Sequence, residues 1–195
     1  MAEKTSPDRR TDILDNAARL FAEQGIGSTS VREISASVGM LSGSLYHHFV
    51  SKDEMVQEIL KGFLDDLQGR YRAALDEGTE PRDTLERLMR VTLEIIRDYP
   101  YATQIYQNEV AYIQKLPKTT GARAISSEIA KIWVDVIENG IASGLFKKDL
   151  DANVVHRLLR DSLWLTARWF VPSPTYSLEK LGDDCTALFL DGLSA

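Results

Sequence analysis

Apolar side chains recur at the spacing of an α-helix along nearly the whole of this 195-residue chain. Ile13, Leu14, Ala17 and Phe21 form the first such face, and comparable faces follow downstream. No run alternates apolar and polar residues as a half-buried strand does, and no internal repeat is present. We therefore expect an all-α fold of about nine or ten helices. Glycine or proline marks the expected helix ends, at Gly25, Gly39, Gly78, Pro100, Pro117, Gly144, Pro172 and Pro174.

These ends define the expected helices. The first ends at Gly25, and Ser51 is an expected N-cap, with Glu54 three residues on completing a capping box. A helix through Leu85 and Ile96 is stopped by Pro100. The other expected helices cover residues 31–38, 42–49, 51–77, 101–116, 122–143, 152–171 and 177–190.

The composition excludes several classes of protein. A single cysteine, Cys185, excludes a disulfide framework and a four-thiolate metal site. No apolar run reaches the ~18 residues of a membrane span, and the polar N-terminus has no signal-peptide apolar region, so we expect a cytoplasmic protein. The three histidines, His47, His48 and His156, have no metal-ligand spacing. With no catalytic constellation in the sequence, we expect neither an enzyme nor a cofactor.

Charge is distributed unevenly. The chain carries 23 basic and 29 acidic residues, a net charge of -6, but residues 1–52 carry six of each sign. The excess acid therefore lies in residues 53–195, which is compatible with a small DNA-binding domain joined to an acidic one, or with ordinary scatter. We expect a flexible tail over 1–7, one domain over 8–52 and a second domain over 53–195.

A tight turn at Gly39-Met40-Leu41 joins two short expected helices, which is the spacing of a helix-turn-helix. We call residues 42–49 the recognition segment. Leu45 and Phe49, four residues apart, can anchor it to a core. The side chains left outward are those of Ser42, Ser44, Tyr46 and His47, which suit DNA phosphates and base edges, although each alone could be a plain surface residue.

Residues 29–55, TSVREISASVGMLSGSLYHHFVSKDEM, resemble the signature of TetR-type bacterial transcriptional repressors. The similarity extends to AARLFAEQG at 17–25 and to GLFKKDLD at 144–151. It implies a helix-turn-helix DNA-binding domain over 8–52 and a ligand-binding and dimerisation domain over 53–195. It also implies a homodimer that binds an inverted repeat in double-stranded DNA and is released by a small-molecule effector. By this resemblance Thr29, Tyr46 and Lys52 contact phosphates, and Arg32, Ser42, Gly43, Ser44 and His47 lie near base edges. His48 either packs or contacts a phosphate.

The resemblance also implies a dimer built from the helices expected at 122–143 and 152–171. Their apolar faces are wider than one protomer's core requires, which suits a four-helix bundle across a two-fold axis. The alternative is that both helices are buried within a monomer. The expected interface residues, including those of a supporting core, are Ile129, Trp133, Val136, Ile137, Leu158, Leu159 and Trp169.

Arg160, Trp164 and Arg168 recur at intervals of four residues in the 152–171 helix, so they are expected on one face. Such a row can pair and stack with an anionic, flat or phosphorylated ligand, or it can form a cation–π stack at the dimer edge. Both interpretations stay open at this point. Phe63 and Tyr106 complete the expected effector site.

At finer grain, three segments resemble an actinobacterial branch of the family that represses late cholesterol ring degradation. They are LSGSLYHHF, KIWVDVIENGI and LLRDSLWLTARW. The branch implies a CoA thioester of a steroid fragment as effector, for which arginines would bind phosphates and an apolar pocket the fused rings. The alternatives are a TetR-type repressor of another acyl-CoA or drug-efflux pathway and, more remotely, a helical interaction protein that does not bind DNA.

Overall fold

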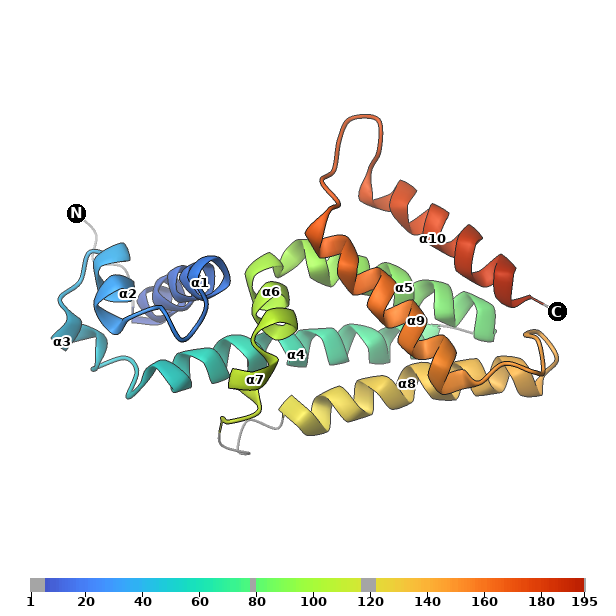
Figure 1. Cartoon of the computed structure of the whole chain (residues 1–195), viewed down its shortest axis with the longest axis horizontal. Helices are drawn as coiled ribbons and strands as arrows, with labels where there is room; N and C mark the ends of the chain where they lie inside the picture. Colours follow the sequence, from blue (N-terminus) through green and yellow to red (C-terminus); the bar gives the residue numbers. More distant parts are fainter. Residues whose placement is uncertain (1–5, 78–79, 117–121, 195) are drawn as a thin grey trace. The chain divides into compact units, whose positions relative to one another are not determined.

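The structure, a computed structural model, describes residues 6–77, 80–116 and 122–194. Within these ranges the chain is all-α, as predicted, and has no β-strand (Figure 1). The helices are α1 (Ser6–Gln24), α2 (Val31–Ser37), α3 (Ser42–Leu45), α4 (Lys52–Glu77), α5 (Pro81–Asp98), α6 (Pro100–Asn108), α7 (Val110–Ile113), α8 (Ala122–Ala142), α9 (Ala152–Leu165) and α10 (Leu178–Leu193), with a 3₁₀ turn η2 (Thr166–Arg168) after α9. No helix in the described part of the chain is both long and apolar enough to cross a membrane.

Helix ends follow the local signals. Gly25, Gly39 and Gly144 all adopt positive φ, as expected where a helix stops. Ser51 accepts the Glu54 N–H at 3.1 Å, but the Glu54 carboxylate accepts from Val50 rather than Ser51, so the predicted capping box is only half formed. A complete capping box, not predicted, joins Ser30 and Glu33 at the start of α2.

Three predicted helices are shorter than expected. The 42–49 helix is the four-residue α3 followed by hydrogen-bonded turns, in which the N–H groups of His48 and Phe49 both donate to the Leu45 carbonyl. The 101–116 helix breaks at Glu109, which has φ -103° and ψ 28° and accepts the Ile26 N–H. The 152–171 helix ends at Leu165, because the Thr166 hydroxyl donates to the Leu163 carbonyl at 2.6 Å and the chain tightens into η2.

The chain packs as two compact units. Unit 1 contains the residues up to Phe63 and the segment Tyr101–Ala122; unit 2 contains Leu64–Pro100 and Arg123–Ala195. The helix α4 contributes to both. The packing boundary thus differs from the division predicted at residues 52/53, which stays a functional prediction. Of the predicted tail, residues 1–5 lie outside the described residues, and α1 begins at Ser6.

Each unit has its own core. In unit 1, residues of α1, α2, the recognition segment and α4 meet residues of α6 and α7; its most buried side chains include Ile13, Phe21, Ile34, Leu45, Phe49, Met55 and Leu60. In unit 2, the rings of Tyr71 and Trp133 meet edge to face at 5.9 Å, and the Tyr71 hydroxyl lies 2.6 Å from that of Thr92. There α5 packs against α9 and α10.

Candidate nucleic-acid interface and effector groove

The turn between α2 and α3 is built on the backbone. Gly39 has φ 67° and its N–H donates to the Ala36 carbonyl at 3.1 Å, while the Met40 N–H donates to the Ser35 carbonyl at 2.8 Å. A residue with a Cβ would be strained at this φ, so glycine suits the position. Leu45 and Phe49 are fully buried, which confirms them as the anchors of the recognition segment.

Most of the predicted DNA contacts lie on the surface of this segment. Tyr46 is 54% exposed, and Arg32, Gly43 and His47 are also exposed. Ser44 and His48 are half-buried. These side chains flank the α2–α3 turn and its continuation, so the surface around the turn carries hydroxyl, imidazole and guanidinium groups.

Thr29 does not fit its predicted role. It is 1% exposed, and its hydroxyl hydrogen is directed at the carbonyls of Gly25 (2.9 Å) and Leu20 (3.3 Å). The hydroxyl is therefore bonded to carbonyls at the end of α1 and in the loop after it instead of reaching outward. We accordingly correct the prediction and omit the Thr29 side chain from the proposed phosphate contacts.

Lys52 is also held internally. Its ammonium donates to the carbonyls of Ile26 at 2.6 Å and of Thr29 at 2.9 Å. The resemblance implies that Lys52 contacts a phosphate. In the structure these two carbonyls already stabilise its charge. An ammonium has three donors, so one remains for a phosphate.

Sequence reasoning missed two exposed apolar residues. Leu41, the N-cap of α3, is 81% exposed and makes no side-chain cap, and Val50, just beyond the recognition segment, is 82% exposed. The sequence could have pointed to Leu41, because the N-cap position of a helix favours Ser, Thr, Asp or Asn and not leucine. A leucine that neither caps the helix nor packs breaks a local rule, which is typical of functional surfaces.

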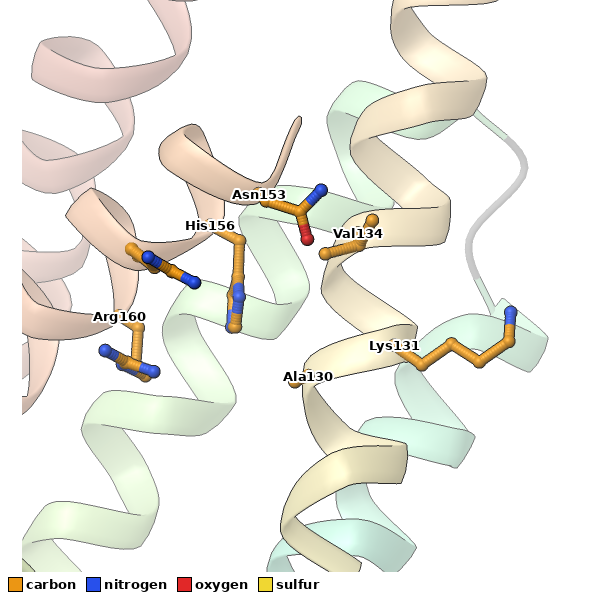
Figure 2. Close-up of a pocket in the computed structure, with 7 residues that line it drawn as sticks. Ala130, Lys131, Val134, Asn153, His156 and Arg160 are labelled. Atoms are coloured by element: carbon orange, nitrogen blue, oxygen red, sulfur yellow. The ribbon is translucent and has the colours of Figure 1, made fainter. Parts of the chain in front are cut away.

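Unit 2 contains a groove of about 380 Å³ between α8 and α9. The groove is lined by Asn153, His156 and Arg160 of α9 and by Ala130, Lys131 and Val134 of α8. In Figure 2 the end of the Lys131 side chain extends away from α9. Arg157 also lines the groove. The lining is thus cationic, although Lys131 pairs with Asp135 at 2.5 Å and Arg160 with Asp161 at 2.8 Å.

His156 is the most buried polar residue of this groove, at 6% exposure, and its ring lies 6.1 Å from that of Trp133. Burial lowers the pKa of His156 below its ordinary value, and the nearby Arg160 charge lowers it further. The imidazole is therefore neutral at pH 7, and the positive charge of the groove comes from Lys131, Arg157 and Arg160.

Comparisons with known proteins agree with this architecture. The profile described as "Bacterial regulatory proteins, tetR family" matches residues 13–59, and "Tetracyclin repressor-like, C-terminal domain" matches residues 78–193. The HTH-type transcriptional repressor KstR2 of Rhodococcus jostii is 42% identical over 187 residues, which are 96% of this chain and 92% of that protein. The chain belongs to the TetR family.

Two solved structures resemble this chain over most of its length. The ketosteroid transcriptional regulator KstR2 of Mycobacterium tuberculosis matches with a TM-score of 0.91 at 37% identity over the whole of both chains. AibR in complex with isovaleryl coenzyme A and operator DNA matches with a TM-score of 0.81 over 93% of this chain and 98% of its own, but at 21% identity it shows the fold alone.

In this TetR-family chain the predicted interface residues separate by burial. Four of them belong to the core of unit 2 and are at most 6% exposed: Trp133, Val136, Ile137 and Leu159. Of the predicted roles, these four fit only that of a core supporting the dimer interface. Ile129 is half-buried. Leu158 and Trp169 are 62% and 61% exposed, and Val154 and Leu165 extend the exposed apolar face of α9.

The predicted effector residues are not all brought together. Arg160 lines the groove, and Trp164 lies half-buried one turn on in α9. Arg168 lies in η2, so the three do not share the face of one continuous helix, which corrects the prediction. Phe63 and Tyr106 pack together in unit 1, with ring centroids 5.8 Å apart, and neither lines the groove.

Proposed function

We propose that this protein is a ligand-responsive transcriptional repressor that binds a palindromic operator as a homodimer and is released by a small-molecule effector. The single observation that carries the proposal is the exposed surface of the recognition segment on a TetR-type helix-turn-helix. In it Tyr46 and the remaining N–H of Lys52 contact phosphates. The base-contacting set is Arg32, Leu41, Ser42, Gly43, Ser44 and His47, with His48 at its edge.

The dimer in this proposal forms through the outer face of α9. Val154, Leu158 and Leu165 recur at intervals of four and seven residues, and each is at least 45% exposed. Trp169 continues the exposed apolar surface beyond η2. A contiguous apolar face of this kind favours a second copy of the chain, and a two-fold axis makes it complementary to itself.

The effector we propose is a CoA thioester of a steroid-degradation intermediate. The groove supports it with three cations that suit phosphates. Trp164 is not part of the groove lining, but it lies one turn beyond Arg160 in α9 and offers an indole ring to a flat apolar group. The names of the KstR2 relatives support a steroid regulator, and AibR is a protein of this fold that binds an acyl-CoA. The alternatives are an effector of another acyl-CoA pathway or a drug.

Release needs a connection between the effector-binding domain and the DNA-binding surface. Unit 1 offers one, because α6 and α7 pack on the helix-turn-helix. Glu109 accepts the Ile26 N–H at 3.3 Å, and the Tyr112 hydroxyl donates to Asp53 of α4 at 2.5 Å. Burial, with this hydrogen bond, raises the pKa of Tyr112 to about 12, so the phenol keeps its proton at physiological pH. A displacement of α7 would therefore shift α4 and the loop after α1, whose carbonyls bind the Lys52 ammonium.

An electrophoretic shift assay tests the proposal, with an operator selected from genomic fragments and three probes: a fused-ring acyl-CoA, its free acid, and CoA alone. We expect the thioester to release the operator with one molecule bound per protomer. Arg160→Ala and Trp164→Ala should raise the thioester concentration needed about tenfold or more, equivalent to at least ~1.4 kcal/mol, without changing operator affinity. Arg97→Ala, on an exposed arginine of α5 outside the groove, is the matched control.

The other outcomes separate the alternatives. Release by the free acid to the same extent would remove the need for CoA and the phosphate role of Arg160. Normal induction of the Arg160 and Trp164 variants with loss of dimer would assign both residues to the interface. Absence of salt-dependent DNA binding by the wild type would favour a helical interaction protein.

A further inference from the structure

Arg10, in α1, connects three segments of unit 1 that are distant in sequence. Its guanidinium forms two hydrogen bonds with the Glu58 carboxylate, at 3.0 and 2.5 Å, and lies 3.5 Å from Glu54. It also donates to the backbone carbonyl of His48 and stacks over the Phe49 ring, 4.0 Å from its centroid. One side chain thus joins α1, the end of the recognition segment and the first two turns of α4.

The recognition segment depends on such contacts because its own helix is short. Four helical residues form a single turn, which is not stable in isolation. Its buried anchors, Leu45 and Phe49, hold the recognition segment against the core of unit 1. The His48 carbonyl is a backbone group at the end of the segment, and a hydrogen bond to it also fixes the direction in which Tyr46 and His47 point.

The opposite side of the guanidinium is fixed as well. Glu54 and Glu58 are one turn apart on α4, and their like charges would repel each other without a cation between them. Glu54 additionally accepts the Val50 N–H at 2.5 Å, so the same carboxylate holds the backbone just after the recognition segment. Because protein groups occupy both sides of Arg10, its guanidinium is engaged by unit 1 itself and not by a phosphate.

We propose that Arg10 is a positioning residue for sequence-specific DNA binding, which holds the end of the recognition segment in register with α4 without touching DNA. This inference rests on the proposed function. It is distinct from the role of a fold-stabilising ion pair. The Arg10, Glu54 and Glu58 side chains are 36–38% exposed, and exposed ion pairs contribute little to stability.

The test compares Arg10→Met with Arg19→Met. Arg19 lies on the same helix, and among the described residues its ion pair is with Glu23, four residues on, at 2.9 Å, which makes it a matched control. Affinities are measured by fluorescence anisotropy for the genomic operator of the wild type and for a scrambled duplex of equal length. We expect Arg10→Met to weaken operator binding about tenfold, with scrambled-duplex binding and melting temperature near wild type. Arg19→Met should match the wild type throughout.

Glu58→Gln weakens the same contact between Arg10 and Glu58 by changing the residue on α4. This variant tests the proposal if Arg10→Met does not fold. It should reproduce part of the operator-specific loss, and the double variant should lose no more than Arg10→Met alone, because both changes break one connection. Equal losses on operator and scrambled DNA would make Arg10 a phosphate contact and overturn the proposal. Wild-type operator affinity in Arg10→Met and Glu58→Gln would also overturn it. A wild type that does not distinguish operator from scrambled DNA would instead contradict the proposed function itself.

Discussion

The hydroxyl oxygens of Ser35 in α2 and Ser42 in α3 lie 3.0 Å apart, across the turn of the helix-turn-helix. The Ser35 hydroxyl donates to the Arg32 carbonyl at 2.9 Å, and a hydroxyl has one hydrogen, so Ser42 is the donor to Ser35. Ser42 was predicted to contact a base edge. With its hydrogen directed at Ser35, it can only accept a hydrogen bond from DNA, which restricts its partners to the amino groups of cytosine and adenine.

The Ser35–Ser42 hydrogen bond should stabilise the DNA-binding domain. We expect Ser42→Ala and Ser35→Ala each to lower the free energy of unfolding by about 1 kcal/mol. The double variant should lose less than the sum, and urea denaturation of the four proteins measures this coupling. Ser37→Ala, which removes a hydroxyl that donates to the Ile34 carbonyl within α2, is the control. Strict additivity would show that the two hydroxyls do not interact.

Leu41 should contact a thymine methyl group in the major groove. Replacing the contacted thymine by uracil removes one methyl, worth about 0.8 kcal/mol, or roughly a fourfold loss of wild-type affinity. The Leu41→Ala variant should bind both operators equally, and anisotropy titrations measure the difference. Leu41→Ser supplies the missing N-cap, so it should raise thermal stability while it weakens operator binding. If uracil lowers the affinity of both proteins alike, the methyl contact belongs to another residue.

The exposed and buried residues of unit 2 should respond differently to a charge. Leu158→Glu, at a 62% exposed position, should give a folded monomer in sedimentation velocity. Val136→Glu, at a 6% exposed position, should cost several kcal/mol of stability (about 3 or more), because a buried unpaired charge is not compensated. Leu188→Glu, on exposed α10, should remain dimeric. A monomeric Leu188→Glu with a dimeric Leu158→Glu would move the interface to α10.

His156 should make the protein less stable in mild acid. Because burial lowers its pKa in the folded state, the unfolded chain binds the proton first as pH falls below about 6.5. Stability therefore rises with pH, by at most about 1.4 kcal/mol per pH unit for this group, between the folded pKa and about 6.5. Urea denaturation at several pH values should show a smaller slope for His156→Gln. An unchanged slope would mean that folding does not lower the pKa of His156.

Local physical chemistry explains what could be read from the sequence. Helical periodicity, the positive-φ glycines at 25, 39 and 144, and the anchors Leu45 and Phe49 depend on residues within a few positions of one another. The sequence therefore determined the all-α class, the helix-turn-helix and its exposed surface. The Ser30–Glu33 capping box was equally local and could have been found by its spacing alone.

The tertiary structure alone decided where polar side chains direct their donors. Thr29 and Lys52 bond to carbonyls of the loop after α1, and Arg10 bonds to residues 38 to 48 positions away, so no sequence spacing reveals these partners. It also decided that α6 and α7 pack with the helix-turn-helix, and that Trp133, Val136 and Ile137 are core residues of one protomer. Burial and hydrogen-bond partners depend on which elements pack together. An amphipathic pattern predicts that one face of a helix is buried, but it does not identify the helix that packs on that face.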